Sequence, residues 1–171
     1  MSNIEKKSVL KVINELEQLG HSSNVIELQD TARSALDASL ALNVPVGAIV
    51  KTLIFIIQSE ETEIPVITLI SGDRLCNTKI LTKLLNVEGK VIRPDADRVK
   101  FITGYSIGGV SPVGLPKELN IYCDSSLKRF EKIWSAAGHP HCVFGATFVE
   151  LINLTGAQIS DLISISDNKN K

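Results

Sequence analysis

The chain has 171 residues, of which 44% are hydrophobic and 22% charged, and its net charge at pH 7 is −1. These values fit one globular domain with a sizeable core and exclude an intrinsically disordered chain. They also exclude a protein that coats nucleic acid through a large excess of positive charge.

The apolar residues form no run of the roughly 18–20 residues that a membrane-spanning helix needs. The charged start of the chain is not typical of a signal peptide. Cys76, Cys123 and Cys142 are odd in number and form no CxxC pair, a pattern that favours reduced thiols in the cytoplasm. We therefore expect a cytoplasmic protein with neither a membrane nor DNA as its partner.

Apolar spacing predicts a helix over residues 5–19, and Thr31 can cap a second helix that runs to about residue 42. Three further helices are expected at about 77–86, 94–101 and 147–156. Eight strands are expected at about 24–28, 47–57, 64–70, 91–92, 119–123, 132–137, 141–144 and 158–163. Strands neighbour strands as often as helices, which favours one α+β domain over residues 1–165, followed by a polar tail at 166–171.

The strand over residues 47–57 is apolar on both alternating faces, which is typical of a strand buried on both sides. Lys51 interrupts it. An ammonium group in such a place is costly to dehydrate unless it meets anions or opens onto a cleft. The alternative is that the side chain extends its amine to the surface from near the start of the strand. Position alone does not separate these two interpretations.

Residues 74–100 carry seven Lys or Arg against three Asp or Glu, whereas residues 1–63 carry five against nine. Such a basic segment could contact a phosphate backbone. The alternative is a solvated helix face with ordinary lysines.

Residues 103–114 contain four glycines and a proline. This composition predicts a loop whose main chain can approach a ligand closely. The loop is not a Walker motif, because no Gly-Lys-Ser/Thr follows, and its glycine spacing does not match a dinucleotide-binding turn. Taken alone, it could equally be a structural loop.

Three segments together resemble the YbaK/prolyl-tRNA-synthetase-associated editing family, whose members are bacterial aminoacyl-tRNA deacylases. The matching residues are Gly47, Val50, Lys51, Thr52 and Leu53, then Ser71-Gly72, and then Thr103-Gly104-Tyr105 leading to Gly108-Gly109-Val110-Ser111-Pro112. The resemblance covers nearly the whole chain. It implies a compact domain built on a mixed, barrel-like sheet.

The resemblance also implies a site. Lys51 is expected in the pocket that receives the acceptor end of tRNA, and Gly108 and Gly109 are expected to position the ester and the attacking water through main-chain groups. The remaining candidates for substrate binding are Ser34, Thr52, Ser111, Pro112, Gly138 and His139. No general base stands out, so a ribose hydroxyl of the substrate can assist proton transfer.

The implied reaction is hydrolysis of mischarged aminoacyl-tRNA without metal or cofactor, with a small amino acid on tRNA-Pro, or Cys-tRNA, as substrate. Prolyl-tRNA synthetase or another translation component is a possible partner. Some free-standing relatives carry Ser-Gly-Gly where this chain has Ala136-Ala137-Gly138, so a hydroxyl near the substrate is absent.

Two alternatives stay open. His139, His141 and Cys142, with Asp124, could hold a catalytic metal, because alternate residues of a strand point the same way. However, no HExxH or CxxC accompanies them. The same fold could also be a binding module that holds aminoacyl-tRNA or a protein without turnover.

Overall fold

The computed structural model describes residues 2–30 and 32–167. The expected helix cap at Thr31 and the end of the predicted polar tail lie outside these residues. The α-helices of the described chain are α1 (Lys7–Gln18), α2 (Ala35–Leu42), α3 (Leu81–Leu85), α4 (Ala96–Thr103) and α5 (Phe148–Thr155). Short 3₁₀ turns occupy Asn3–Glu5, Val46–Ala48, Thr78–Ile80 and Ser125–Arg129.

The strands of the described residues form three open sheets. The largest has the order β5-β2-β3-β6-β9, with bounds Lys90–Ile92, Val50–Gln58, Glu63–Ser71, Asn120–Asp124 and Gln158–Ser160. A second has the order β1-β8-β7, with bounds Ile26–Glu27, Cys142–Ala146 and Ile133–His139. The third pairs β10 (Ser164–Ser166) with β4 (Arg74–Cys76).

The predicted α+β class is confirmed, and the largest sheet is mixed, since β3–β6 and β6–β9 are parallel pairs. The sheet does not close into a barrel among the described residues, where β5 and β9 are its outer strands. The boundary expected at residue 165 falls inside β10. None of the described helices has the length and hydrophobicity that a membrane crossing requires.

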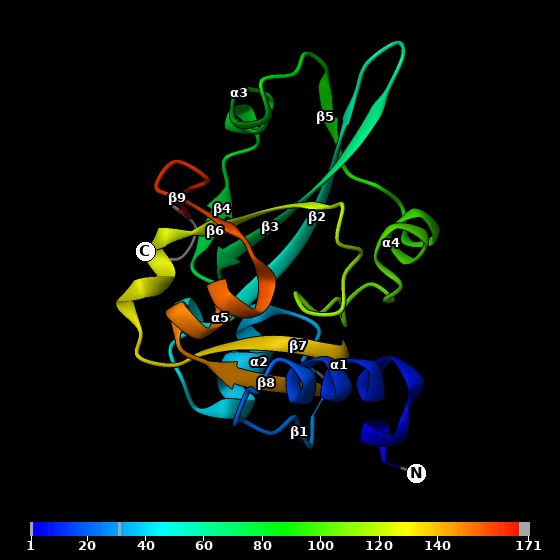
Figure 1. Cartoon of the computed structure of the whole chain (residues 1–171). Coiled ribbons are helices and arrows are strands. Elements are labelled where there is room, and N and C mark those ends of the chain that lie inside the picture. Colours follow the sequence, from blue (N-terminus) through cyan, green and yellow to red (C-terminus); the bar gives the residue numbers. More distant parts are fainter. Residues whose placement is uncertain (1, 31, 168–171) are drawn as a thin grey trace.

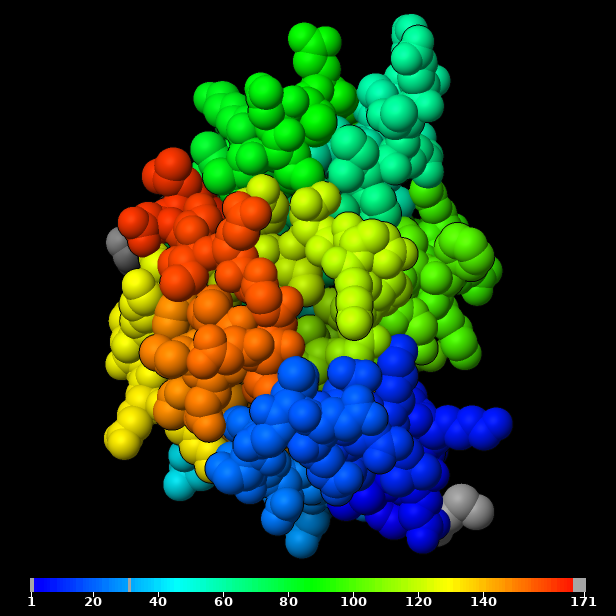
Figure 2. All heavy atoms as spheres, viewed as in Figure 1, coloured from blue at the N-terminus to red at the C-terminus, as the bar shows by residue number. Residues whose placement is uncertain are grey.

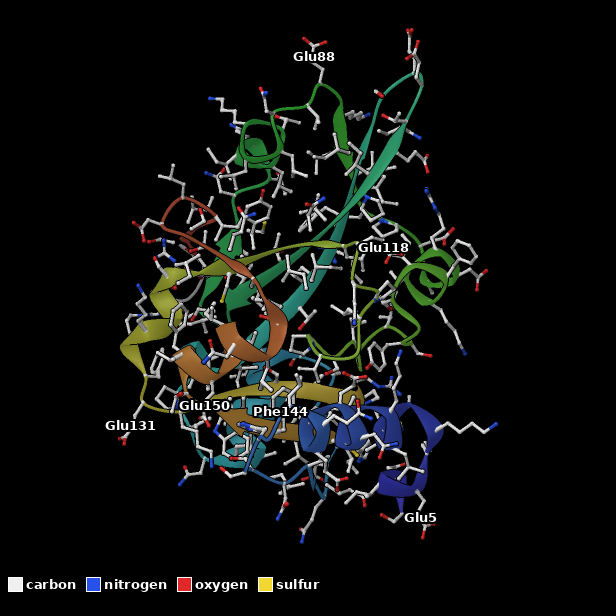
Figure 3. All side chains as sticks on the ribbon, viewed as in Figure 1. Glu5, Glu88, Glu118, Glu131, Phe144 and Glu150 are labelled. Atoms are coloured by element: carbon white, nitrogen blue, oxygen red, sulfur yellow. The ribbon has the colours of Figure 1, made fainter. Side chains whose placement is uncertain are left out.

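Two hydrophobic clusters lie on opposite faces of the β2–β3 hairpin, as the two apolar faces of β2 predict. Val50 and Ile54 belong to the larger cluster, which includes α1, α5 and Phe144 of β8 (Figure 3). Phe55 and Ile57 belong to the smaller cluster with Leu81 of α3. Figure 1 shows the hairpin running between these two groups of elements, with α3 and β5 toward one end and α1 with the β1-β8-β7 sheet toward the other.

Several predicted elements differ in extent. The helix expected at 77–86 is a 3₁₀ turn followed by the five-residue α3, which ends at Asn86 in the left-handed conformation. The strand expected at 158–163 stops at Ser160. The helix expected from 94 begins at Ala96, because the Asp95 side chain accepts from the N–H of Arg98 and caps it.

The free half of β2 is the feature that positions the site. β3 pairs with all nine residues of β2, but β5 pairs only with Ile56, Ile57 and Gln58. Pro94 follows β5 two residues later and has no N–H to donate, so the β2–β5 ladder cannot continue there. The edge of β2 from Val50 to Phe55 therefore has no paired strand among the described residues. The residue before it, Ile49, forms a single bridge with Trp134.

The turn after β3 fixes the start of this edge. The N–H of Gly72 donates to the carbonyl oxygen of Ile49 at 2.8 Å, and Ser71 Oγ donates to the carbonyl of Gly47 at 2.5 Å. The Arg129 guanidinium donates to both carboxylate oxygens of Asp73, at 2.7 and 3.0 Å, and so ties the turn to the segment after β6.

A methyl group at Gly72 would overlap the carbonyl oxygen of Val46. We expect Gly72→Ala to lower the melting temperature by roughly 4–10 °C, because overpacking costs about 1–3 kcal/mol. The control is Gly20→Ala, where the added methyl meets nothing within 4 Å and only the positive φ of 73° is strained. An equal loss in the two variants, measured by thermal unfolding, would contradict this account of the turn.

Candidate functional site

A cavity of about 430 Å³ opens along the free edge of β2. Its walls come from elements far apart in the sequence. They are residues 32–35 at the start of α2, residues 49–54, Arg93-Pro94, the glycine loop at 107–110, and residues 134–136 of β7. This volume lies in the range typical of small-molecule sites.

The main chain of β2 supplies hydrogen-bonding groups to this cavity. In an antiparallel pair, successive residues direct their N–H and C=O groups alternately toward and away from the partner strand. The Ile49–Gly72 hydrogen bond sets the alternation, so Lys51 and Leu53 bond toward β3. The N–H and C=O groups of Thr52 and Ile54 consequently point to the open side, where the cavity lies.

Lys51 lies in the cavity lining and is half-buried. Its ammonium group donates to the main-chain oxygen of Arg74, which leaves two of its three N–H donors for other partners. Burial lowers the pKa of Lys51 from its ordinary value of 10.5, while the charges of Asp167, Asp73 and Asp124 oppose that shift. The amine is therefore held at the cavity by the main chain, rather than extended freely into solvent.

Two further cations line the cavity, Arg33 ahead of α2 and Arg93 after β5. The Arg93 guanidinium lies 5.0 Å from the centroid of the Phe55 ring. Neither arginine is expected at the site from the sequence, although Arg93 is part of the basic segment at 74–100. Within the described residues, the lining includes no carboxylate, imidazole or thiol. The site is thus suited to an anionic ligand and offers no side-chain general base.

The glycine loop forms another wall. Gly108 lines the cavity with φ of +89°, a conformation that favours glycine. Gly109 packs against the end of β7, since a methyl group there would lie 2.7 Å from the Cα of His139. The N–H of Gly109 donates to the carbonyl of Ser106 at 3.1 Å, and Tyr105 Oη donates to the carbonyl of Val113 at 2.7 Å. The loop is therefore fixed, and its Gly108 end faces the cavity.

The other candidates from the sequence divide into two groups. Ser34 and Thr52 line the cavity with Lys51 and Gly108, and Ser34 also caps α2 by accepting from the N–H of Asp37 at 3.1 Å. The remaining candidates lie behind the wall. They are Gly109, Ser111, Pro112, Gly138 and His139.

These residues behind the wall have structural partners. Ser111 is buried, and its Oγ accepts from the N–H of Val113 at 3.2 Å. Gly138 has φ of +90°, and its carbonyl accepts from Ser8 Oγ at 2.7 Å. The pKa of His139 is lowered by burial and by the positive charge of Lys6, whose Nζ lies 3.3 Å from its Nε2.

The expected alternation of His139 and His141 on one strand is wrong. His139 ends β7, His141 lies in the turn, and Cys142 begins β8 opposite His139. The two imidazole rings have centroids 5.4 Å apart. Among residues 2–30 and 32–167, no three His, Cys, Asp or Glu side chains are grouped so that they could hold a metal ion.

β7 contributes Trp134, Ser135 and Ala136 to the lining. Ala136, the first residue of the Ala136-Ala137-Gly138 segment, therefore lies in the cavity wall itself. Trp134 is half-buried, and the Nζ of Lys132 lies 4.6 Å from the centroid of its ring.

The chain belongs to the aminoacyl-tRNA editing domain family, whose sequence model matches residues 29–154. Its structure is similar to that of a candidate trans-editing enzyme for prolyl-tRNA synthetase, with a TM-score of 0.81, 35% identity and coverage of 92% of this chain and 98% of the other.

Two curated relatives extend the comparison. The chain is 24% identical over 152 residues to the uncharacterised protein YwhH of Bacillus subtilis, covering 89% of this chain and 94% of YwhH. It is 33% identical over 97 residues to the proline–tRNA ligase of Nitratidesulfovibrio vulgaris, a match that covers 57% of this chain and 16% of the ligase.

The lowered pKa of Lys51 means that the folded state binds this proton less tightly than the unfolded chain does. The buried ammonium therefore destabilises the fold at neutral pH, and the penalty fades as the pH rises through the lowered pKa toward 10.5. We expect Lys51→Met to raise the melting temperature at pH 7 by a few degrees, with a difference from wild type that narrows at high pH.

The control for this prediction is Lys79→Met, which removes an exposed ammonium group and should leave the melting temperature nearly unchanged. A Lys51→Met protein that unfolds at a lower temperature than wild type at pH 7 would show that the amine stabilises the fold instead.

Proposed function

We propose that this editing-domain protein hydrolyses the ester between a wrongly attached amino acid and the 3′-terminal ribose of tRNA. The observation that carries the proposal is the meeting of Lys51, the free main-chain groups of β2 and the Gly108 turn around one cavity. An editing site of this kind removes amino acids that a synthetase pocket cannot reject, because one methylene changes binding by only about 1–3 kcal/mol.

In this proposal, the cations and the main-chain groups bind different parts of the substrate. Lys51 contacts the phosphate or ribose oxygens of the terminal adenosine, using the two N–H donors that Arg74 leaves. Arg33 and Arg93 contribute further positive charge at the same cavity. The main-chain groups of Thr52 and Ile54 bind the polar atoms of the aminoacyl group, as a neighbouring strand would.

Water then adds to the ester carbonyl, and the carbonyl oxygen becomes an oxyanion. In this proposal the N–H of Gly108 donates to that oxygen, which is supported by its place in the cavity lining and by its lack of an acceptor in the described chain. The tetrahedral intermediate collapses, the bond to the ribose oxygen breaks, and the products are the free amino acid and tRNA. Because no side-chain base lines the cavity, the neighbouring ribose hydroxyl carries the proton from water to the leaving oxygen.

Specificity follows from the walls beside the ester. Ala136 presents a methyl group where some relatives carry a hydroxyl, which favours a small apolar side chain over a polar one. We therefore propose a small amino acid on tRNA-Pro as the substrate, with Cys-tRNA as the second candidate. The reaction belongs to translation in the cytoplasm and uses the protein's own groups, with prolyl-tRNA synthetase or another translation component as a partner.

The test is a deacylation assay with alanine, cysteine, serine and a small non-protein amino acid attached to tRNA-Pro. We expect rapid multiple turnover of one of these substrates. Lys51→Met should lower kcat/KM for it by about 10²–10³, the effect of removing one charged or oxyanion-binding group. Lys79→Met is the control and should match wild type.

The same assay decides between the alternatives. A protein that binds tRNA but releases no amino acid from any substrate is a binding module, and this outcome would overturn the proposal. Activity that disappears after exhaustive chelation and returns with added metal would instead support the metal-dependent hydrolase.

A further inference from the structure

A second hollow, of about 400 Å³, lies where α1, α4 and the start of the glycine loop meet. Its lining is basic and polar. The residues are Lys7, Ser8 and Lys11 of α1, Lys100 of α4, and Gly104 and Ser106 of the loop. Three of the six are lysines, in a chain whose net charge is −1.

None of these three ammonium groups forms an ion pair with a carboxylate in the described part of the chain. Glu5 projects from the turn ahead of α1, away from α4 (Figure 3). Glu15, one helical turn beyond Lys11, packs beside Gly114 together with the stem of Lys11 but forms no ion pair with it. Lys11 itself lies over the Tyr105 ring, 5.0 Å from the centroid. Three exposed like charges around one hollow repel one another, and an anion placed between them relieves that repulsion.

The hollow is attached to the candidate active site through a short, fixed stretch of chain. Ser106 lines the hollow, and the next two residues, Ile107 and Gly108, line the cavity. The nearest lining residues of the two sites, Ser106 and Ile107, are thus adjacent in the chain, about 3.8 Å apart between Cα atoms. Figure 2 shows the blue residues of α1 packed directly against the yellow-green segment that follows α4.

The contact between α1 and the cavity wall is also tight. Ser8 Oγ donates to the carbonyl of Gly138, and a methyl group on Gly138 would come within 2.5 Å of the Ser8 carbonyl oxygen. The turn at 138–140 in turn packs on Gly108 and Gly109. Hollow and cavity therefore keep a fixed spacing, as two subsites for one polymeric ligand require.

An exposed aromatic residue follows one of the lysines of the hollow in the sequence. Phe101 follows Lys100 on α4, and 92% of its surface is exposed. Exposed aromatic side chains beside a basic groove are typical of single-stranded nucleic acid sites, where bases stack on the rings. Inorganic phosphate or an acidic peptide would leave this ring unused.

We propose that Lys7, Lys11 and Lys100 bind the phosphodiester backbone of the tRNA acceptor arm while its 3′ end occupies the cavity, and that Phe101 stacks on an unpaired base near that end. This inference rests on the proposed function, because it assigns the path of the same substrate. It adds a subsite that increases the affinity for tRNA and does not contact the ester.

The experiment compares Lys7→Gln/Lys11→Gln/Lys100→Gln with a matched control, Lys79→Gln/Lys83→Gln/Lys90→Gln. The control removes three exposed lysines from the α3 and β5 end of the molecule (Figure 1). Binding of uncharged tRNA-Pro is measured between about 50 and 200 mM salt. Each lost phosphate contact makes the slope of log K against log salt less steep by about 0.7–0.9. The slope for the Lys7/Lys11/Lys100 variant should therefore be less steep than that of wild type by about 2 to 3.

Phe101→Ala gives an independent signature. It should weaken tRNA binding by about tenfold, the effect of one lost stacking contact, with the salt slope unchanged. A salt slope in the Lys7/Lys11/Lys100 variant equal to that of wild type, or an equal loss in the control variant, would overturn the inference.

A minimal ester separates this inference from the proposed function. Alanine esterified to adenosine alone fills the cavity without crossing the hollow, so the hollow variant should hydrolyse it as wild type does while its KM for charged tRNA rises by about tenfold or more. If wild type hydrolyses neither substrate, the proposed function fails. If wild type hydrolyses both and the variant's KM for tRNA is unchanged, only the inference fails.

Discussion

The unpaired half of β2 is the constraint on which the rest of the site depends. A free strand edge is normally a liability, because its main-chain groups can pair with another chain. Here Pro94 prevents β5 from extending along it, and α2, the glycine loop and β7 surround the edge instead of pairing with it. The result is a cavity with free main-chain groups along one side, and hydrogen bonds that a ligand forms with them would not depend on side-chain identity.

The turns around that edge are held rigidly, whereas Lys51, which lies on it, lowers the stability of the fold. The Gly108–Gly109 turn lies directly on the β7–β8 turn, and the Arg129–Asp73 pair holds the chain before β4. Against this fixed frame, Lys51 keeps a partly dehydrated ammonium group whose pKa is lowered by burial. A group that disfavours the fold but lines the cavity is typical of functional sites, where binding takes precedence over stability.

The sequence predicted the two strands of the central hairpin, the lysine within the first of them and the α+β class, because apolar periodicity and β-branched content are local signals. The helix expected at 147–156 is likewise a local signal, since α5 begins at a capping box formed by Thr147 and Glu150. Arg33, Arg93 and Trp134 could not be selected in this way, since only the tertiary fold brings them to one cavity. The basic segment at 74–100 divides for the same reason, with Arg93 at the cavity and Lys100 at the hollow.

The most direct measurement of the central claim is an amide NMR titration with an uncleavable substrate analogue, in which an amide links alanine to the 3′ position of adenosine. We expect the largest shifts at the N–H groups of Thr52, Ile54 and Gly108, with small shifts for Lys51 and Leu53, whose N–H groups bond to β3. Large shifts confined to other surfaces, with the amides of Thr52 and Ile54 unchanged at saturation, would contradict the account.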